Sequence, residues 1–288
     1  MDKVDKMCDF IINNTFFMEK PVFSIIIPTY NRCHLLWRAI NSILSQTYPF
    51  FELLIIDDCS TDKTKELIDI YTDPRIKYFK LRENKGASHA RNYALNKAKG
   101  KYIAYLDSDN EWHRDFLESY LKAFQDYPEK VVVFAKKNYR LKIVEKNGKE
   151  KVLRDETTNH GKYFDLKRLW QRKILIDTNT LVHKKEIIKK VGKWDEKMDF
   201  WEDWEFTLRM SQKYPEGFLY LNRALIDYEQ KIDFSNPKKV IGNWNRNEKY
   251  IFNKHKKYPL IKFQDWYPPQ KHKSTVSIVK FLMEKKKG

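Results

Sequence analysis

Two carboxylates separated by a single residue, Asp107 and Asp109 around Ser108, stand at the end of an apolar run of sequence. The run 102–106 (YIAYL) is typical of a buried strand, and open α/β sheets bind ligands beyond the carboxyl ends of their strands. Two carboxylates this close repel each other unless a cation lies between them. The triplet therefore predicts a divalent metal and, beyond the metal, a phosphate. On its own, the triplet could also be a loop that caps a following helix.

A second acidic pair, Asp57 and Asp58, follows the apolar run 51–56 in the same way. One carboxylate here could accept hydrogen bonds from a nucleobase or a ribose, and the alternative role is helix capping. Pro28 ends an earlier apolar run, 23–27. Because the carboxyl ends of parallel strands lie at one edge of a sheet, we expect these three strand ends to converge on one crevice.

Arg91 and the acidic segment 201–205 (WEDWE) offer two further kinds of chemistry. The planar guanidinium of Arg91 suits phosphate oxygens, although an exposed helical arginine is the plain alternative. Acids at a helix start are stabilised by the helix dipole, which alone could explain the second segment. The functional interpretation makes one acid a general base, because the flanking indoles reduce its exposure and raise its pKa. Indole faces also suit a sugar ring.

The elements that must position these residues alternate between strand and helix in the first half of the chain. Apolar runs predict strands at 23–27, 51–56, 76–81 and 102–106, and helical spacing joins them. Near-continuous apolar strands joined by helices indicate a parallel sheet covered on both faces. The first strand is followed by no G-x-G-x-x-G or Walker loop, which disfavours the ordinary dinucleotide and P-loop interpretations.

The second half is less regular. A hairpin is expected around Asn147-Gly148. The other elements predicted here are strands at 131–134, 141–144, 151–153, 218–221 and 224–228, and helices at 184–191 and from 201.

Composition bounds the class of protein. The 288 residues suffice for one large domain with an appendage, and 42% hydrophobic residues exclude global disorder. Segment 238–288 carries +11 of the net charge of +17. Three cysteines without a C-x-x-C pair indicate neither a disulfide framework nor a zinc site, so we expect a reducing cytoplasm. We find no signal-peptide pattern and no apolar run of the roughly 18–20 residues that a membrane span needs.

Together these motifs resemble a family-2 glycosyltransferase of the GT-A fold. The resemblance covers residues 22–228 and is densest in its first part. The matching segments are 24–32 (SIIIPTYNR), 42–48 (SILSQTY), 52–62 (ELLIIDDCSTD), 84–92 (NKGASHARN), 107–109 (DSD) and 201–203 (WED).

The resemblance implies a nucleotide-sugar donor, which we expect to be a UDP-sugar, and a metal, Mn²⁺ or Mg²⁺. Pro28, Tyr30 and Asp58 would line the nucleobase pocket, and Asp57 would support its loop. Asp107 would face the ribose or the metal, and Asp109 would bind the metal. The full implied donor-binding set is Pro28, Thr29, Tyr30, Arg32, Asp57, Asp58, Asn84, Lys85, Arg91, Asp107 and Ser108.

The resemblance also implies an inverting, single in-line displacement at the anomeric carbon. Asp203 would deprotonate the acceptor hydroxyl, with Glu202 beside it, and the metal would offset charge on the leaving nucleoside diphosphate. Trp201, Trp204, Asn179 and Lys231 are expected near the acceptor or the sugar. Many relatives carry a histidine near Lys231, and a protonated lysine would pair with phosphate instead of ligating a metal.

The implied fold is α/β: a Rossmann-like, mostly parallel sheet flanked by helices, with a smaller acceptor-side subregion. We predict an N-terminal extension at 1–20, a glycosyltransferase domain at 21–235 and a basic aromatic segment at 236–288. The domain divides into a nucleotide-binding half, 21–130, and an acceptor-side half, 131–235. The interleaved lysines and aromatic residues of the C-terminal segment suit an anionic membrane surface, and the alternative is packing on the body.

The expected role is the extension of a cell-surface glycan or lipid-linked acceptor by a cytoplasmic enzyme, peripheral at the membrane. Three other interpretations remain. A nucleotidyltransferase shares a related sheet and paired acids but leaves 201–205 unexplained. A nucleic-acid-binding protein explains the net charge but not the acids at strand ends, so this partner is disfavoured. A non-catalytic sensor would bind the nucleotide sugar and transfer nothing.

Overall fold

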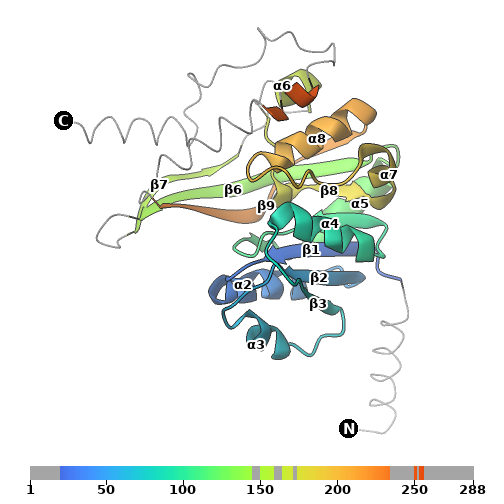
Figure 1. Cartoon of the computed structure of the whole chain (residues 1–288). Coiled ribbons are helices and arrows are strands. Elements are labelled where there is room, and N and C mark those ends of the chain that lie inside the picture. The colour runs from blue at the N-terminus through green and yellow to red at the C-terminus, as the bar shows by residue number, and fades with distance from the viewer. Residues whose placement is uncertain are drawn as a thin grey trace, which may run out of the picture.

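The chain folds around a mixed β-sheet with helices on both faces, as a computed structural model shows (Figure 1). The structure describes residues 20–144, 150–158, 164–170, 174–233, 250–251 and 253–255. Within these residues the sheet has nine strands in the order β3-β2-β1-β4-β8-β6-β9-β5, and β7 pairs with β6. The predicted α/β fold class is confirmed. The predicted N-terminal extension and most of the C-terminal segment lie outside the described residues.

The nucleotide-binding half is the predicted parallel sheet. Its strands are β1 (Phe23–Thr29), β2 (Phe51–Asp57), β3 (Ile76–Lys80) and β4 (Tyr102–Tyr105), and its helices are α2 (Cys33–Leu44), α3 (Thr64–Asp69) and α4 (Ala87–Lys97). Every residue of β1 and β2 is buried. Alternate residues of β1 reach opposite faces, so Ile25 packs with α2 and Ile26 packs with α4. Burial on both faces explains why these strands are continuous apolar runs.

The part of the chain from residue 111 to residue 233 adds antiparallel pairing. Its strands are β5 (Glu111–Trp112), β6 (Val132–Val144), β7 (Glu150–Thr157), β8 (Val182–Lys184) and β9 (Phe218–Asp233). Its helices are α5 (Phe116–Asp126), α6 (Leu166–Trp170), η1 (Thr178–Thr180), η2 (Lys185–Ile187), α7 (Ile188–Val191) and α8 (Glu202–Lys213). Strand β8 lies antiparallel between β4 and β6, and β6 and β9 run parallel to each other.

Two pairs of short predicted strands are wrong in extent, because each pair is one long strand. Segments 131–134 and 141–144 belong to β6, and segments 218–221 and 224–228 belong to β9. The pairing of β6 with β9 shifts register after Ala135 and again after Lys136. Bulges of this kind bend a strand without ending it. The predicted hairpin pairs β6 with β7, and its turn lies outside the described residues.

The carboxyl ends of β1, β2 and β4 meet at one edge of the sheet, as predicted. Thr29 pairs with Asp57, and the N–H of Asp58 donates to the carbonyl of Thr29 at 2.8 Å. The N–H of Leu106 donates to the carbonyl of Ile26 at 3.0 Å, which brings Asp107 beside the other two ends. Ligands of such sheets bind at this edge.

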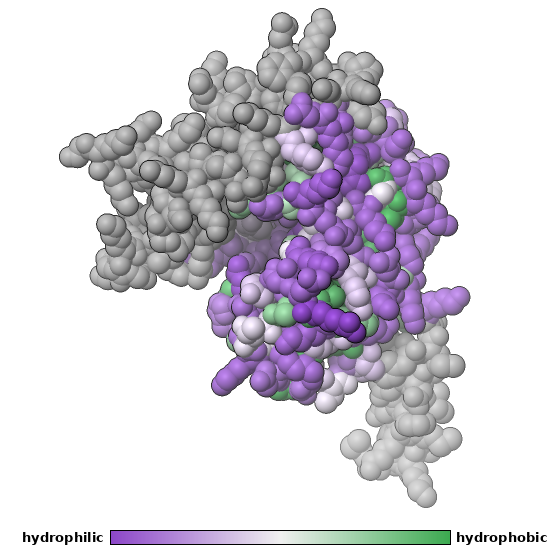
Figure 2. Space-filling view, viewed as in Figure 1, coloured by the Kyte–Doolittle hydropathy of each residue, from purple (hydrophilic) through white to green (hydrophobic). Residues whose placement is uncertain are grey.

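The described residues show no extended apolar face on the side of the molecule drawn in Figure 2. On the side drawn in Figure 2, the described surface is mostly hydrophilic, and apolar side chains form small separate patches. Among the described residues, no helix combines the length and the apolar character needed to cross a bilayer.

Gly100 allows the turn before β4 to pack directly on β1. A Cβ at this position would lie 2.4 Å from the nitrogen of Ser24 and 2.6 Å from the carbonyl carbon of Phe23. Both are backbone atoms of a buried strand, so the clash cannot be relieved by a side-chain rotation. We expect Gly100→Ala to lower the free energy of unfolding by about 1–3 kcal/mol, measured by urea denaturation. The exposed neighbour serves as control, since Lys99→Ala should change it by less than about 0.5 kcal/mol. Equal midpoints for the two variants would contradict the close approach.

Candidate functional site

The carboxylates at the end of β2 are buried, and both hold the backbone of neighbouring loops. Oδ1 of Asp57 accepts from the N–H of Ser60 at 2.7 Å, and the hydroxyl of Tyr78 donates to Oδ2. The carboxylate of Asp58 accepts from the backbone N–H groups of Lys85 at 3.0 Å and Gly86 at 2.6 Å. Asp57 thus supports its own loop, and Asp58 fixes the turn that begins α4.

The turn 84–86 contributes backbone groups to this arrangement. Asn84 and Lys85 are exposed. The ammonium of Lys85 pairs with Glu83, while its N–H is used on Asp58. Sequence patterns predicted this turn in the donor site, and the structure places it beside the end of β2.

The loop after β1 crosses the loop after β2. The N–H of Asn31 donates to Oγ of Ser60 at 2.9 Å, and Oδ1 of Asn31 accepts from the N–H of Thr61 at 2.8 Å. Asn31 and Cys59 both adopt left-handed backbone angles, with φ of 52° and 70°. Such conformations are strained for residues other than glycine and concentrate at functional sites.

Next to this crossing, the predicted nucleobase residues present an open aromatic face. The ring of Tyr30 is 45% exposed. Thr29, one residue earlier, is buried, and its Oγ1 has no hydrogen-bond partner among the described residues. The same holds for Oγ of Ser88 in the first turn of α4. Buried hydroxyls without partners are uncommon in folded proteins and suit a site that receives a polar ligand.

The two carboxylates of the 107–109 triplet have different surroundings. Oδ1 of Asp107 accepts from Arg91 at 2.8 Å, and Oδ2 accepts from Asn179 at 3.0 Å. Asp109 accepts from Nη1 of Arg32 at 3.1 Å and from Nδ2 of Asn110 at 3.2 Å. Burial, and then the negative charge of Asp107, raises the pKa of Asp109. Ser108 between them is buried.

Arg91 is a buried bridge between the two halves of the domain. Its side chain is 3% exposed, Nη2 donates to Asp107, and Nη1 donates to Glu202 at 3.2 Å. The guanidinium lies over the ring of Trp194, with Cζ 4.8 Å from the ring centroid. Although burial alone would lower it, Asp107 and Glu202 raise the pKa of Arg91. These two carboxylates engage both terminal nitrogens of Arg91, and its expected place near the phosphates stays a prediction.

The start of α8 carries the predicted catalytic acids. Trp201 precedes the helix with a left-handed φ of 65°, and Glu202 and Asp203 form its first turn. The N–H of Trp204 donates to Oδ1 of Asp203 at 2.7 Å. Burial, with the charges of Glu202 and Asp177, raises the pKa of Asp203 to about 8. A carboxylate in this state is a stronger base than an exposed aspartate.

This pKa predicts how Asp203 affects stability. An unfolded aspartate ionises at about pH 3.9, whereas the folded protein holds this proton up to about pH 8. The folded state therefore binds the extra proton between these values, and its stability falls as pH rises through that window. Asp203→Asn cannot ionise, so we expect its melting temperature to exceed that of the wild type by about 2–5 °C near pH 8. The difference should vanish near pH 4 in scanning calorimetry, and a constant offset would contradict the raised pKa.

Two of the four residues predicted near the acceptor lie in the core instead. Trp204 is 1% exposed, and its Nε1 donates to the carbonyl of Leu169 at 3.0 Å. Asn179 is fully buried, with its amide used on Asp107. Lys231 pairs through its backbone with Lys142 in the β6–β9 ribbon, and its side chain lies outside the described residues. Trp201 is partly buried, packs against the core and lies beside the predicted catalytic acids.

A divalent metal fits the carboxylates at this edge. Asp107 and Asp109 supply the oxygen ligands that Mg²⁺ and Mn²⁺ prefer, and a cation would relieve the unfavourable charge of Asp109. Across the described residues, no three His, Cys, Asp or Glu side chains are grouped to enclose an ion. Oxygens of a diphosphate and water molecules could complete the coordination.

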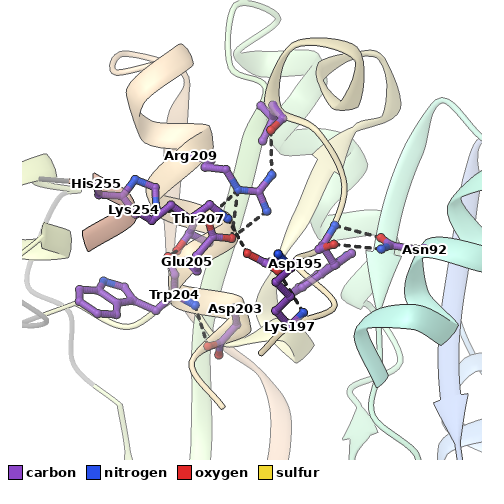
Figure 3. A network of polar contacts seen from close by, with 12 residues as sticks. Asn92, Asp195, Lys197, Asp203, Trp204, Glu205, Thr207, Arg209, Lys254 and His255 are labelled. Carbon is purple, nitrogen blue, oxygen red and sulfur yellow. Dashed lines mark hydrogen bonds and ion pairs between the residues drawn. The ribbon is translucent and has the colours of Figure 1, made fainter. Parts of the chain in front are cut away.

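A buried ionic cluster around Glu205 holds α8 next to the predicted catalytic acids (Figure 3). The carboxylate of Glu205 is fully buried and accepts two hydrogen bonds from Nε and Nη2 of Arg209, both at 2.8 Å. Lys254 and His255, from the C-terminal segment, reach the same carboxylate at 2.8 and 3.2 Å. Lys254 also pairs with Asp195 at 2.6 Å. This part of the C-terminal segment therefore packs on the body.

Sequence reasoning missed the residues that connect these groups. Lys137, Asp177 and Trp194 each contact a predicted site residue or its partner. Asn179 was predicted near the acceptor or the sugar and not as a partner of Asp107, and Asp177 was visible only as a polar residue of the same loop. Lys137 and Trp194 carried no signal, because their partners are distant in sequence.

Comparisons with known proteins agree with the geometry. The family model described as "Glycosyl transferase family 2" matches residues 24–192. The putative teichuronic acid biosynthesis glycosyltransferase TuaG of Bacillus subtilis is 45% identical over 105 residues, 36% of this chain and 42% of that protein. WfgD of Escherichia coli, a UDP-Glc:alpha-D-GlcNAc-diphosphoundecaprenol beta-1,3-glucosyltransferase, is 45% identical over 101 residues, 35% of this chain and 40% of that protein. The matched segment thus spans less than half the length of these relatives.

Solved structures share the fold. S. aureus TarS 1–349 in complex with UDP-GlcNAc superposes with a TM-score of 0.60 at 22% identity, covering 80% of this chain and 66% of that one. The mannosyltransferase PcManGT from Pyrobaculum calidifontis, in complex with GDP-Man and Mn²⁺, superposes with a TM-score of 0.56 at 16% identity. It covers 85% of this chain and 74% of that one.

Proposed function

The chain belongs to glycosyl transferase family 2, and on that basis we propose that it transfers a sugar from a UDP-sugar to an acceptor hydroxyl with inversion. The observation that carries the proposal is the bridge from Asp107 through Arg91 to Glu202. The edge formed by the carboxyl ends of β1, β2 and β4, where the donor would bind, is called the donor edge. The bridge sets Asp107 at this donor edge beside the start of α8, which carries Asp203 as the proposed base. A site that only bound a nucleotide would not need Asp203 next to that edge.

The residues divide the work between donor and acceptor. The exposed ring of Tyr30 offers a stacking face to a nucleobase, and Asp58 keeps the adjoining turn in place. Asp109, with Asp107, would hold Mn²⁺ or Mg²⁺, which when bound supplies positive charge to the diphosphate leaving group. Arg32, beside Asp109, adds a second cation at that edge.

Asp203 acts on the acceptor. Its carboxylate takes the proton of the acceptor hydroxyl while the oxygen attacks the anomeric carbon, and the bond from that carbon to the diphosphate breaks with the electron pair leaving on the diphosphate oxygen. One displacement of this kind inverts the anomeric configuration. The raised pKa favours proton transfer to Asp203.

The names of relatives support a class of acceptor. WfgD acts on a diphosphoundecaprenol-linked sugar, and TuaG is assigned to teichuronic acid biosynthesis. We therefore propose a lipid-linked glycan as acceptor, in the synthesis of a cell-surface polysaccharide. Such an acceptor lies at the inner face of the cell membrane, so we propose a cytoplasmic, peripheral location, with the basic C-terminal segment near the anionic surface.

The variant Asp109→Asn tests whether a metal held by Asp109 assists the binding of UDP. In titration calorimetry with Mn²⁺ present, we expect Asp109→Asn to weaken UDP affinity at least about 10-fold, because one of two carboxylate ligands loses its charge. Asp126→Asn is the control, since Asp126 forms an exposed pair with Lys122 on α5. Equal affinities in the two variants would contradict the metal site.

Transfer itself is tested with a panel of UDP-, GDP-, CMP- and dTDP-sugars and a lipid-diphosphate-linked acceptor. We expect turnover with a UDP-sugar and release of UDP. Release of pyrophosphate from a nucleoside triphosphate and a sugar phosphate would instead favour a nucleotidyltransferase. UDP binding without transfer to any acceptor would favour a sensor.

A further inference from the structure

A chain of buried polar side chains reaches the Asp107 carboxylate from the acceptor side of the sheet. We propose that Lys137, Asp177 and Asn179 are positioning residues that fix this carboxylate for donor binding. The inference rests on the proposed function and names side chains that act through Asp107 without touching the substrate themselves. Its three links come from β6, from the residue before η1 and from η1 itself.

Asn179 grips Asp107 at two points. Its Oδ1 accepts from the backbone N–H of Asp107 at 2.6 Å, and its Nδ2 donates to Oδ2 of the carboxylate at 3.0 Å. With Arg91 on Oδ1 at 2.8 Å, both carboxylate oxygens have a donor. Rotation of the carboxylate would break at least one of these bonds, so its orientation is set before any donor arrives.

Asp177 in turn orients Asn179. Its Oδ1 accepts from the backbone N–H of Asn179 at 2.9 Å and from Nδ2 at 2.8 Å. Because one amide group serves both carboxylates, the amide cannot flip without turning its oxygen toward Asp107 and Asp177. The orientation of the Asn179 amide, with its nitrogen toward the two carboxylates, therefore depends on the negative charge of Asp177.

Lys137 keeps Asp177 charged. Its Nζ lies 2.5 Å from Oδ2 of Asp177, and both side chains are mostly buried, at 13% and 16% exposure. The ammonium also lies 3.7 Å from the ring centroid of Tyr228, on β9. Although burial alone would raise it, Lys137 lowers the pKa of Asp177. Removing the ammonium leaves a buried carboxylate without its cation, an arrangement that proteins avoid.

The chain continues through Arg91 to Glu202, beside Asp203. Donor edge and base-bearing helix are thus joined by one series of bonds that starts at β6. A purely structural ion pair would need no such connection. The Lys77–Glu52 pair gives the contrast: Nζ of Lys77 lies 2.6 Å from Oε2 of Glu52, whose side chain is 3% exposed, and Glu52 lies near the start of β2, at the opposite end of the strand from Asp57.

The test compares Lys137→Met, Lys137→Arg and the control Lys77→Met by UDP affinity with Mn²⁺ and by kcat and KM for the donor. We expect Lys137→Met to lower UDP affinity and kcat/KM about 10–100-fold, Lys137→Arg to recover most of the loss, and Lys77→Met to stay near wild type. Equal values for the two methionine variants, or no recovery with arginine, would overturn the proposal.

A second measurement guards against a folding defect. The shorter side chain of Asn179→Ser cannot make both hydrogen bonds to Asp107. If Lys137 and Asn179 act through the same series of contacts, the loss of UDP affinity caused by Asn179→Ser should be much smaller in the Lys137→Met background than in the wild type. Full additivity would overturn the proposal, and if Lys137→Met does not fold, Asp177→Asn, which removes the charge that orients the Asn179 amide, takes its place in this cycle. The affinity measurement needs no acceptor, so a wild type that binds UDP and transfers nothing would count against the proposed function and still test the chain.

Discussion

Asparagine in place of Asp203 is expected to lower kcat about 10²–10⁴-fold and to leave UDP affinity nearly unchanged. Asparagine keeps the shape of the side chain and can still accept from the N–H of Trp204. It cannot take a proton from an acceptor hydroxyl. The loss should therefore appear in turnover. The donor edge is built from strand ends and not from α8, so it should still bind UDP.

The pH dependence gives an independent check on the same residue. The base must be ionised, so activity should rise with pH as the proton leaves Asp203, whose pKa is raised to about 8 in the protein without ligands. We expect an acid limb in the profile of kcat/KM that lies well above the pH at which exposed carboxylates titrate. This limb should be absent from the residual activity of Asp203→Asn.

Glu66→Gln is a suitable control, because Glu66 is an exposed acid in the first turn of α3, away from the site. Its kinetics and pH profile should match the wild type. Full turnover in Asp203→Asn would remove Asp203 from the role of base. A parallel loss of UDP affinity would instead point to a damaged site.

The donor edge could be predicted because its signals are local in sequence. Apolar runs mark β1, β2 and β4 as buried parallel strands, and topology alone then brings Pro28, Asp57 and Asp107 to one edge. The order of the motifs along the chain was enough to identify the family. No knowledge of side-chain partners was needed for either step.

Long-range pairs could not be predicted in this way. Arg91 and Glu202 lie 111 positions apart, and nothing in either segment indicates that they meet. The pattern around 201–205 predicts a helix start but not which face is buried. Trp204 was therefore predicted near the acceptor or the sugar, and its side chain is buried in the core. The full lengths of β6 and β9 were not predicted because both strands continue through bulges, where the sequence pattern indicates the end of a strand.

The C-terminal segment shows the same limit. Its composition indicates only a basic surface, and the predicted domain ends at 235. Lys254 and His255 nevertheless contact Glu205 on α8, and Tyr250 donates to Asp195 at 2.8 Å. Part of the positive charge is thus used inside the fold. We infer that the unit that folds around α8 includes residues 250–255.

Glu205→Ala is expected to lower the free energy of unfolding by about 3–5 kcal/mol, the usual cost of breaking a buried ion pair from one side. Arg209, Lys254 and His255 would then face one another without the carboxylate that they share.

Burial opposes ionisation of Glu205, but His255 and Arg209 lower its pKa to about 2. Because an unfolded glutamate ionises at about pH 4.3, this stabilisation is complete above about pH 5 and is lost as pH falls toward 2. The difference in the free energy of unfolding between wild type and variant, measured by urea denaturation, should therefore decrease in acid.

The control is Lys65→Ala, which removes an exposed pair with Asp69 and should lower the free energy of unfolding by less than about 0.5 kcal/mol. An equally small cost for Glu205→Ala would mean that the C-terminal segment does not depend on this cluster, and the domain would then end nearer to 235.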